Sequence, residues 1–418
     1  MGKRKTQIDF EWLAAEVAAA RQIDPQGGVS FAGWALEELR LVAMTGLQLP
    51  DDVSDDEAQS IAWSGLKAAA EKHADLTGKR LDRELKRAAA EFLRKPLNPF
   101  VLYTTVTLSR ASRVKGARLD GVTISLQQVI PRRFDRSFVS GSMMARDLED
   151  DSRFLKVRVR VQARTPSSAV RSAMSSLHFL RGAWNLSLNR PRWREWAVDQ
   201  TKPFNKIRPG PLHTLHHLSG RPAAQAYWYE PFFRPDVLSL SGSKLAGVER
   251  ETARIRTLAR ASSYGAELRR AVSWYCTALD LPDPQLAFLK LWGLLEYLTD
   301  TSFMRHEDTI DRVLFLYQDP GVDRHVLQFL KDHRNRSVHA GADAIDREML
   351  VLLHRFAVRL LLTALQSGRV FRSRKEFGQF LGLPGDADQL MRRLAVLREA
   401  IRFRGAGKHT GAASAPIS

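Results

Sequence analysis

The chain has 418 residues, of which 44% are hydrophobic, and it carries a formal net charge of +18 at pH 7. This length exceeds one ordinary domain of roughly 100 to 200 residues, so we expect two or three domains. The positive charge favours an anionic partner (nucleic acid, a membrane surface or a phosphorylated small molecule), with mere solubility as the alternative. The single cysteine, Cys276, excludes an internal disulfide framework and a cysteine-based zinc site, and it indicates a reducing, cytoplasmic setting.

The start of the chain does not have the pattern of a signal peptide. Its basic residues 1–5 are followed by Asp9, Glu11 and Glu16 instead of an apolar run. No stretch of about 18 apolar residues occurs anywhere, so we expect no membrane-spanning helix and no membrane partner.

Residues 1–96 are predicted to form a helical N-terminal region. Apolar residues share a helix face at its start, at Phe10, Leu13, Ala14 and Val17. Pro96 and Pro99 mark a boundary, after which the hydrophobic period changes from that of a helix to that of a strand.

Residues 97–245 are predicted to form an α+β domain. Apolar residues alternate with polar ones over 102–108, 122–126 and 154–164, which indicates three strands. A helix is predicted to begin at Pro166, because apolar residues follow it at helical spacing.

The strand over residues 154–164 has one apolar face and one basic face. Lys156, Arg158 and Arg160 could contact an RNA backbone, although charges on an exposed or edge strand also prevent aggregation. Arg192 and Trp193, in a basic and aromatic patch further on, could stack on unpaired bases, or the rings could pack against the sheet.

Three histidines, His213, His216 and His217, lie close together in the same domain. Carboxylate or cysteine partners at a metal-binding spacing are missing, so we expect no metal site there. No glycine-rich loop ends in Lys-Ser or Lys-Thr, which argues against a phosphate-binding NTPase, and we expect no cofactor.

Residues 246–370 are predicted to form an all-α antiparallel helical bundle. Asp283-Pro284 has the composition of an N-cap followed by a first helical residue, and Glu307-Asp308 is predicted to start another helix that Asp319-Pro320-Gly321 ends. A strongly periodic helix follows over residues 349–364.

Residues 371–418 are predicted to be a basic extension. It has a small helix around Phe377 and a second helix from Leu390 to Ile401, which we interpret as a dimer or partner contact. These two helices could instead form a DNA-binding helix-turn-helix, but no turn glycine or recognition helix supports that alternative. Residues from Gly405 onward are expected to be disordered.

One stretch, residues 331–341, concentrates basic, imidazole and amide groups between two apolar helices. Arg334 and His339 are five positions apart, so on one ideal helix they point in directions roughly 140° apart. Arg334 must therefore reach around the helix or lie at a helix start. Either arrangement can aim both groups at a cleft.

Cleavage of RNA by its own 2′-hydroxyl needs a base, an acid and positive charge at the phosphorus. Histidine titrates near neutral pH, and arginine binds phosphate oxygens in a bidentate manner. One copy offers one well-placed histidine for two proton transfers. The chemistry therefore favours a homodimer that brings two copies of the stretch together.

Arg334-Asn335 followed by His339 resembles the R-x4-6-H signature of HEPN domains. With Gly341 after the histidine, residues 250–368 look most like the Apea-like HEPN branch of prokaryotic defence proteins. This resemblance implies a metal-independent endoribonuclease, active as a dimer, with Arg334 and His339 catalytic and Asn335 supporting their geometry. It also implies products that end in a 2′,3′-cyclic phosphate and a 5′-hydroxyl.

Three further residues could support such a site. Glu296 interrupts an apolar helix and could orient Arg334 or His339, or it could form a structural ion pair. His333 could take part in proton transfer or cap the helix end, and Arg336 is assigned to RNA binding.

The alternative function is non-catalytic. The same arginine, asparagine and histidine could join two helices by hydrogen bonds in a protein that binds nucleic acid or nucleotides, or that serves as a scaffold. For an antiviral or toxin ribonuclease, we expect the middle domain to recognise an activating, phage-derived ligand.

Overall fold

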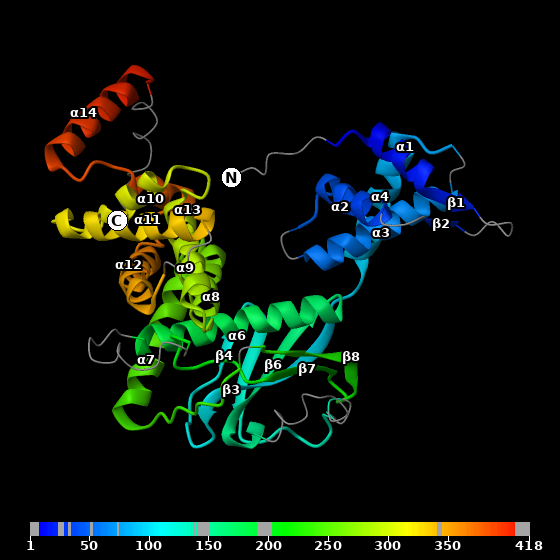
Figure 1. The fold of residues 1–418 in the computed structure, drawn as a ribbon, viewed down its shortest axis with the longest axis horizontal. Coiled ribbons are helices and arrows are strands. Elements are labelled where there is room, and N and C mark those ends of the chain that lie inside the picture. Colours follow the sequence, from blue (N-terminus) through cyan, green and yellow to red (C-terminus); the bar gives the residue numbers. More distant parts are fainter. Residues whose placement is uncertain are drawn as a thin grey trace, which may run out of the picture. The chain divides into compact units, whose positions relative to one another are not determined.

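The computed structural model describes residues 8–23, 29–31, 35–50, 53–72, 75–134, 136, 139, 150–189, 203–231, 233–340 and 345–405. Within these ranges the protein is a mixed α+β structure, mostly helical, with antiparallel sheets, which confirms the predicted fold class at this coarse level (Figure 1). None of the helices in these ranges is both long and apolar enough to cross a membrane.

The chain forms two compact units, each made of two stretches of sequence. Unit 1 comprises residues 1–177 and 209–240, and unit 2 comprises residues 178–208 and 241–418. The first boundary between the units falls within the helix α6 (Pro166–Leu188), and the others follow residues 208 and 240. The predicted domain boundaries after residues 96, 245 and 370 stay predictions.

The N-terminal part of unit 1 is helical, as its sequence predicts. It contains the elements α1 (Phe10–Ala20), β1 (Arg21–Ile23), β2 (Val29–Phe31), α2 (Ala35–Gly46), α3 (Asp55–Lys72) and α4 (Gly78–Arg94). Asp9 is the N-cap of α1, and its carboxylate accepts hydrogen bonds from two backbone N–H groups of the first turn. The predicted apolar face of α1 is buried at Leu13, Ala14 and Val17.

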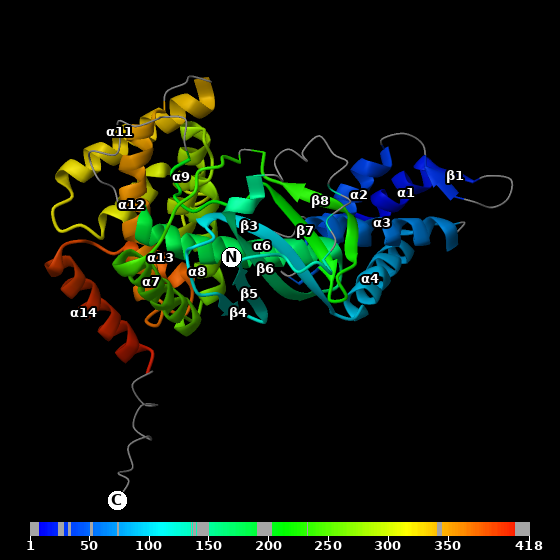
Figure 2. The same cartoon turned by 90° about the horizontal axis from the view of Figure 1, so that it is seen from below.

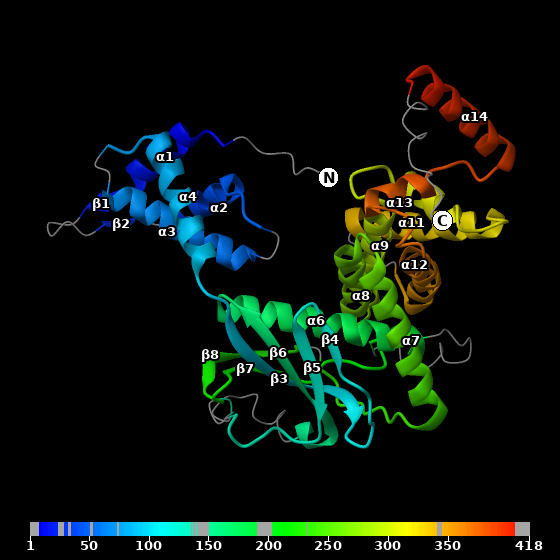
Figure 3. The same cartoon turned by 180° about the vertical axis from the view of Figure 1, so that it is seen from behind.

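Unit 1 also contains a six-stranded antiparallel sheet (Figure 3). Its strands are β3 (Asn98–Ser109), β4 (Ala117–Leu119), β5 (Val122–Gln127), β6 (Phe154–Ala163), β7 (Leu212–His217) and β8 (Pro222–Tyr229), in the spatial order β4-β5-β6-β3-β7-β8. The three strands predicted from alternation correspond to β3, β5 and β6. The basic strand β6 is not an edge strand, because it pairs with β5 on one side and with β3 on the other.

Both faces of the sheet are covered at its centre. Every residue of β3 from Phe100 to Leu108 is buried. The first half of α6 (Pro166–Leu188) lies over one face of the sheet (Figure 3). Phe134 packs on Tyr103 of β3, with ring centroids 4.7 Å apart. The alternation in β6 therefore separates an apolar layer from a mixed polar layer, not a core from open solvent.

The described part of unit 2 is mostly helical (Figure 2). Besides the second half of α6, its helices are α7 (Gly242–Ala261), α8 (Gly265–Leu279), α9 (Pro284–Thr299), α10 (His306–Leu314), α11 (Gly321–Ala340), α12 (Arg347–Gln366), α13 (Arg374–Leu381) and α14 (Ala387–Phe403). Asp283 caps α9 through a 2.9 Å hydrogen bond from the N–H of Leu286, and Pro284 is its first residue, as predicted. Cys276 is fully buried in α8.

One predicted helix end is wrong. Asp319-Pro320-Gly321 does not end α10, which already ends at Leu314. Tight turns follow at once, since the N–H groups of Leu316 and Tyr317 bond to carbonyls only three residues earlier. Gly321 instead begins α11, the helix that carries Arg334 and Asn335.

Candidate functional site

The motif, which consists of Arg334, Asn335 and His339, lies in the last two turns of α11. This helix contacts α10 and α12. Leu327 and Leu330 anchor its buried face, with exposed fractions of 1% and 0%. Arg334 lies four residues after Leu330, and Ser337 lies seven residues after Leu330. All three therefore lie on the same side of the helix. The arginine therefore lies at the edge of the packed face and is only partly buried.

Arg334 lies inside the helix, so the alternative that it occupies a helix start is wrong. Because His339 belongs to the same helix, positions 334 and 339 are roughly 140° apart around the α11 axis. The side chain of His339 lies outside the described residues, and so does Gly341. A single copy of α11 thus presents the two positions toward different sides.

The positive charge of Arg334 is not neutralised by any residue that the structure describes. Its Nη1 atom donates a 3.3 Å hydrogen bond to Oδ1 of Asn335, and it forms no ion pair in the described part of the chain. Lys331 differs, since its Nζ atom is 3.0 Å from Oε1 of Glu307, and this contact raises the pKa of Lys331. Among the described residues, the Arg334 guanidinium is therefore bonded to its neighbour's amide and has no carboxylate partner.

The hydroxyl of Ser337 lies on the same side of α11. It is buried, with 5% of the residue exposed, and its Oγ atom has no hydrogen-bond partner among the described residues. A buried, unsatisfied hydroxyl beside a partly buried arginine marks a polar place in an otherwise packed helix face.

His333 and Arg336 interact with each other. The Nη2 atom of Arg336 is 2.7 Å from Nε2 of His333, and the imidazole packs on Phe329 with ring centroids 4.3 Å apart. A guanidinium donates to the ring nitrogen, so in this arrangement Nε2 of His333 accepts. Arg336 itself is exposed.

Glu296 contacts α10 rather than the motif. Its Oε1 atom accepts a 2.9 Å hydrogen bond from Nε1 of Trp292 and is 3.2 Å from Nδ1 of His306. These partners fix the carboxylate between α9 and the first residue of α10. No contact with Arg334 occurs, so an orienting role for Glu296 has no support in the described residues.

The proposed RNA-contacting residues of β6 differ in exposure. Lys156 is only 8% exposed, Arg158 is half-buried, and Arg160 alone has an exposed side chain. Arg192 and Trp193 lie outside the described residues. RNA contact by this row stays a prediction, and Arg160 is its accessible member.

The clustered histidines belong to the sheet. His213 places Nδ1 2.6 Å from Oγ1 of Thr104 and Nε2 3.0 Å from Oε1 of Glu230. His216 contacts the carbonyl of Gly220 and the hydroxyl of Thr214, at 3.1 and 3.0 Å. Both ring nitrogens of each imidazole thus have partners within unit 1. No group of three or more histidine, cysteine or acidic side chains among the described residues has an arrangement that could hold a metal ion.

A buried polar network in unit 2 escaped sequence reasoning. Arg181, with 0% of its side chain exposed, forms a bidentate ion pair with Asp280 through contacts of 3.1 and 2.8 Å. The side-chain amide of Asn205 donates a 2.8 Å hydrogen bond to the same carboxylate, and that of Asn189 donates a 2.9 Å hydrogen bond to Oδ1 of Asn205. A signal existed, since Arg181, Asn185 and Asn189 recur every four residues along an apolar helix and so share one face.

The network continues to a buried histidine in α12. Asn189 donates to the hydroxyl of Tyr275 (3.2 Å), and that hydroxyl is 2.9 Å from Nε2 of His354. Burial lowers the pKa of His354 to about 3, and burial likewise raises the pKa of Tyr275. Both groups are therefore neutral at physiological pH and serve to position the segment around Asn205 on α8.

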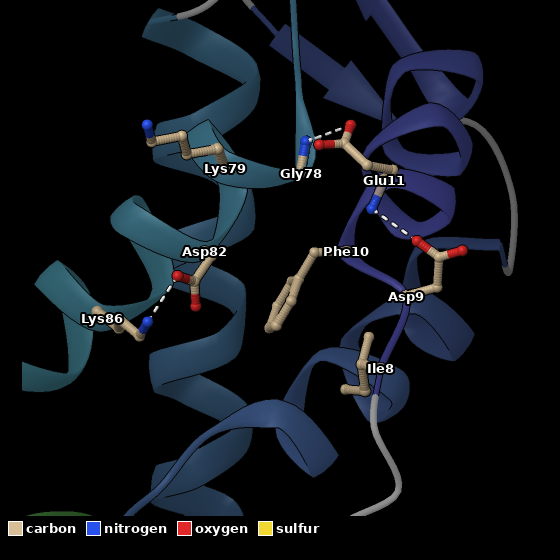
Figure 4. A pocket seen from close by; sticks show the side chains of 8 residues that line it. All are labelled: Ile8, Asp9, Phe10, Glu11, Gly78, Lys79, Asp82 and Lys86. Atoms are coloured by element: carbon tan, nitrogen blue, oxygen red, sulfur yellow. Dashed lines mark hydrogen bonds and ion pairs between the residues drawn. The ribbon is translucent and has the colours of Figure 1, made fainter.

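A pocket of about 660 Å³ lies among the N-terminal helices (Figure 4). Phe10 and Glu11 line it from the α1 side, and Asp82 and Lys86 line it from α4. Glu11 accepts a hydrogen bond from the N–H of Gly78 (2.8 Å), while Lys86 pairs with Asp82 (2.6 Å). Acidic residues (Asp9, Glu11 and Asp82) and basic residues (Lys79 and Lys86) both line the pocket, so it has no concentrated charge of one sign to attract a charged ligand.

Comparison with protein-family models, with curated proteins and with solved structures finds no match to this chain. The functional assignment therefore rests on the residues of α11 and their surroundings.

Proposed function

We propose that this protein is a HEPN-type endoribonuclease in which the helices of unit 2 form the bundle that carries the site. The observation that best supports this proposal is that Arg334 is partly buried and has no carboxylate partner among the described residues. It occurs five residues before a histidine at the end of a helix. The resemblance to HEPN domains of the Apea-like branch agrees with this arrangement and gives the reaction class.

Each motif residue has a chemical role in this proposal. Arg334 binds the non-bridging phosphate oxygens and stabilises the charge that develops at phosphorus. Asn335 is a positioning residue, because its amide oxygen accepts from the Arg334 guanidinium. His339 transfers protons, since an imidazole titrates near the working pH.

The reaction needs no added oxidant, reductant or cofactor. The 2′-oxygen attacks the adjacent phosphorus and gives up its proton to a base, while the bond from phosphorus to the 5′-oxygen breaks and that oxygen takes a proton from an acid. The products are a 2′,3′-cyclic phosphate and a 5′-hydroxyl. We expect cleavage to continue in the presence of EDTA.

A homodimer completes the site in this proposal. One α11 presents positions 334 and 339 toward different sides, and one histidine cannot serve both ends of the scissile bond at once. A two-fold axis near the end of α11 would place the histidine of one copy near the arginine of the other. On the resemblance alone, we assign the enzyme to cytoplasmic defence or toxin systems that respond to a phage-derived or other signal.

The test uses purified protein and a structured RNA mixture. Arg334→Ala and His339→Ala should each lower the cleavage rate at least about 100-fold, because each removes charge stabilisation or proton transfer at the reacting phosphate. Arg324→Ala is the matched control, since Arg324 lies on the same helix and pairs with Asp311. Equal melting temperatures would show that all variants fold.

Two outcomes would overturn the proposal. If His339→Ala and Arg334→Ala bind RNA and cut it as well as the wild type, the motif is not catalytic. If both variants melt well below the Arg324→Ala control, the motif holds the helices together, and the non-catalytic alternative is favoured.

A further inference from the structure

The helix α14 exposes its apolar side chains on all sides. It is 17 residues long, and none of its residues is buried among the described residues. Met391, Leu397 and Ile401 are 62%, 61% and 53% exposed. An isolated helix of this length is marginally stable in water, so a covering partner would stabilise it.

The apolar residues of α14 form a narrow stripe. Leu390, Leu394, Leu397 and Ile401 follow one another at intervals of four, three and four residues. This spacing is that of the a and d positions of a coiled coil, and it places all four side chains within roughly 60° around the helix. The stripe therefore fits the seam between two packed helices.

Arginines border this stripe on both sides. In the same heptad frame, Arg393 occupies a g position and Arg398 an e position, and neither forms an ion pair in the described part of the chain. The acidic residues lie elsewhere, with Glu399 opposite the stripe, where it pairs with Arg402 at 2.6 Å. Both edges of the seam are thus basic.

The basic edges decide which occupant fits. In a parallel pair of α14 helices, Arg393 of one copy would face Arg398 of the other, and like charges at g and e positions disfavour pairing. A helix that lies on a lipid surface needs a broad apolar face, yet the exposed Val396 and Phe403 of α14 lie on the side away from the stripe.

We propose that α14 docks an amphipathic helix of another protein, with apolar residues at its a and d positions and acidic residues at its e and g positions. The apolar seams of the two helices pack together, and the carboxylates of the partner pair with Arg393 and Arg398. This interaction is separate from the α11 site and holds whether or not the protein cleaves RNA.

The probe is a designed three-heptad peptide with leucine at a and d and glutamate at e and g. The control peptide has the same sequence except for lysine at e and g. We expect the full-length protein to bind the acidic peptide and not the basic one. Leu394→Ala with Leu397→Ala should weaken binding about 100-fold, because two seam residues lose their buried contacts.

Charge reversal gives a second and sharper readout. The double variant Arg393→Glu, Arg398→Glu should no longer bind the acidic peptide and should bind the basic one. Val396→Ala, a substitution away from the seam, should change the binding of neither peptide. Because no residue of α14 is buried by the part of the chain that the structure describes, these substitutions should leave the rest of the fold intact.

Three outcomes would overturn the proposal. If the protein binds neither peptide, a helical partner for α14 is excluded. Binding to vesicles that contain anionic lipid, without peptide binding, would make α14 a membrane-surface helix. Self-association that disappears in the Leu394→Ala, Leu397→Ala variant would make a second copy of this chain the occupant.

Discussion

At the scale of single residues, unit 2 contains a histidine whose pKa is lowered by burial. His354 is 2% exposed and contacts the hydroxyl of Tyr275. Nothing in its sequence context marks it, because it falls within the apolar pattern of α12 that predicts core residues. Its pKa of about 3 in the folded state shows that the histidine stays neutral there.

This burial predicts a pH dependence of stability. In the unfolded chain His354 has a pKa of about 6.5, so between pH 6.5 and 3 the unfolded state binds a proton that the folded state does not. The free energy of unfolding should therefore fall as the pH drops below 6.5, by about 2 kcal/mol at pH 5 from this group.

His354→Gln keeps an amide that can bond to Tyr275 and removes the titration. Denaturant unfolding at pH 7 and pH 5 should show a smaller loss of stability on acidification for this variant than for the wild type. An unchanged loss would mean that His354 is accessible to protons in the folded state.

The motif itself could be found from sequence because arginine, asparagine and histidine stand together there between apolar runs. Its geometry could only be partly predicted. The spacing of Arg334 and His339 gave two possible placements of the arginine, and only the extent of α11, from Gly321 to Ala340, shows that both residues belong to one helix. The contact of Glu296 with His306 depends on how α9 and α10 pack, which the local pattern does not encode.

At the scale of elements, strands with strict alternation were predictable and the others were not. The strands β3, β5 and β6 alternate clearly, whereas β7 contains three histidines and β8 contains a run of three aromatic residues, so neither shows a plain period of two. The predicted basic face of β6 is partly covered, since Lys156 is buried and Arg158 is half-buried, and Phe134 packs on Tyr103 of the neighbouring strand β3. Long-range packing of that kind leaves no local signal.

The partial covering of β6 predicts different effects for two basic residues. Arg160→Ala should weaken RNA binding several-fold, with a smaller salt dependence, because an exposed arginine can contact a phosphate. Lys156→Ala should instead lower the melting temperature and leave RNA affinity nearly unchanged, since Lys156 is buried. Filter binding over a range of salt concentrations would compare them, and equal losses of affinity would contradict the assignment of Arg160 as the accessible member.

At the scale of the whole molecule, the proposed reaction requires two chains. A protein whose catalytic groups come from both copies should have a mass in light scattering of twice the 47.2 kDa of one chain. Its specific activity should fall when it is diluted below the dissociation constant of the dimer. Full activity in a strictly monomeric sample would show that one α11 suffices.

The central claim is that residues of α11 cut RNA by internal transfer, and the chemistry of the new RNA ends tests it most directly. Wild type and His339→Ala should be produced at equal levels in a bacterial host, and total RNA should be examined for new 5′-hydroxyl ends. The account predicts new 5′-hydroxyl ends, with 2′,3′-cyclic phosphates on the matching fragments, for the wild type alone. New 5′-phosphate ends, or the same new ends from the folded His339→Ala variant, would contradict it.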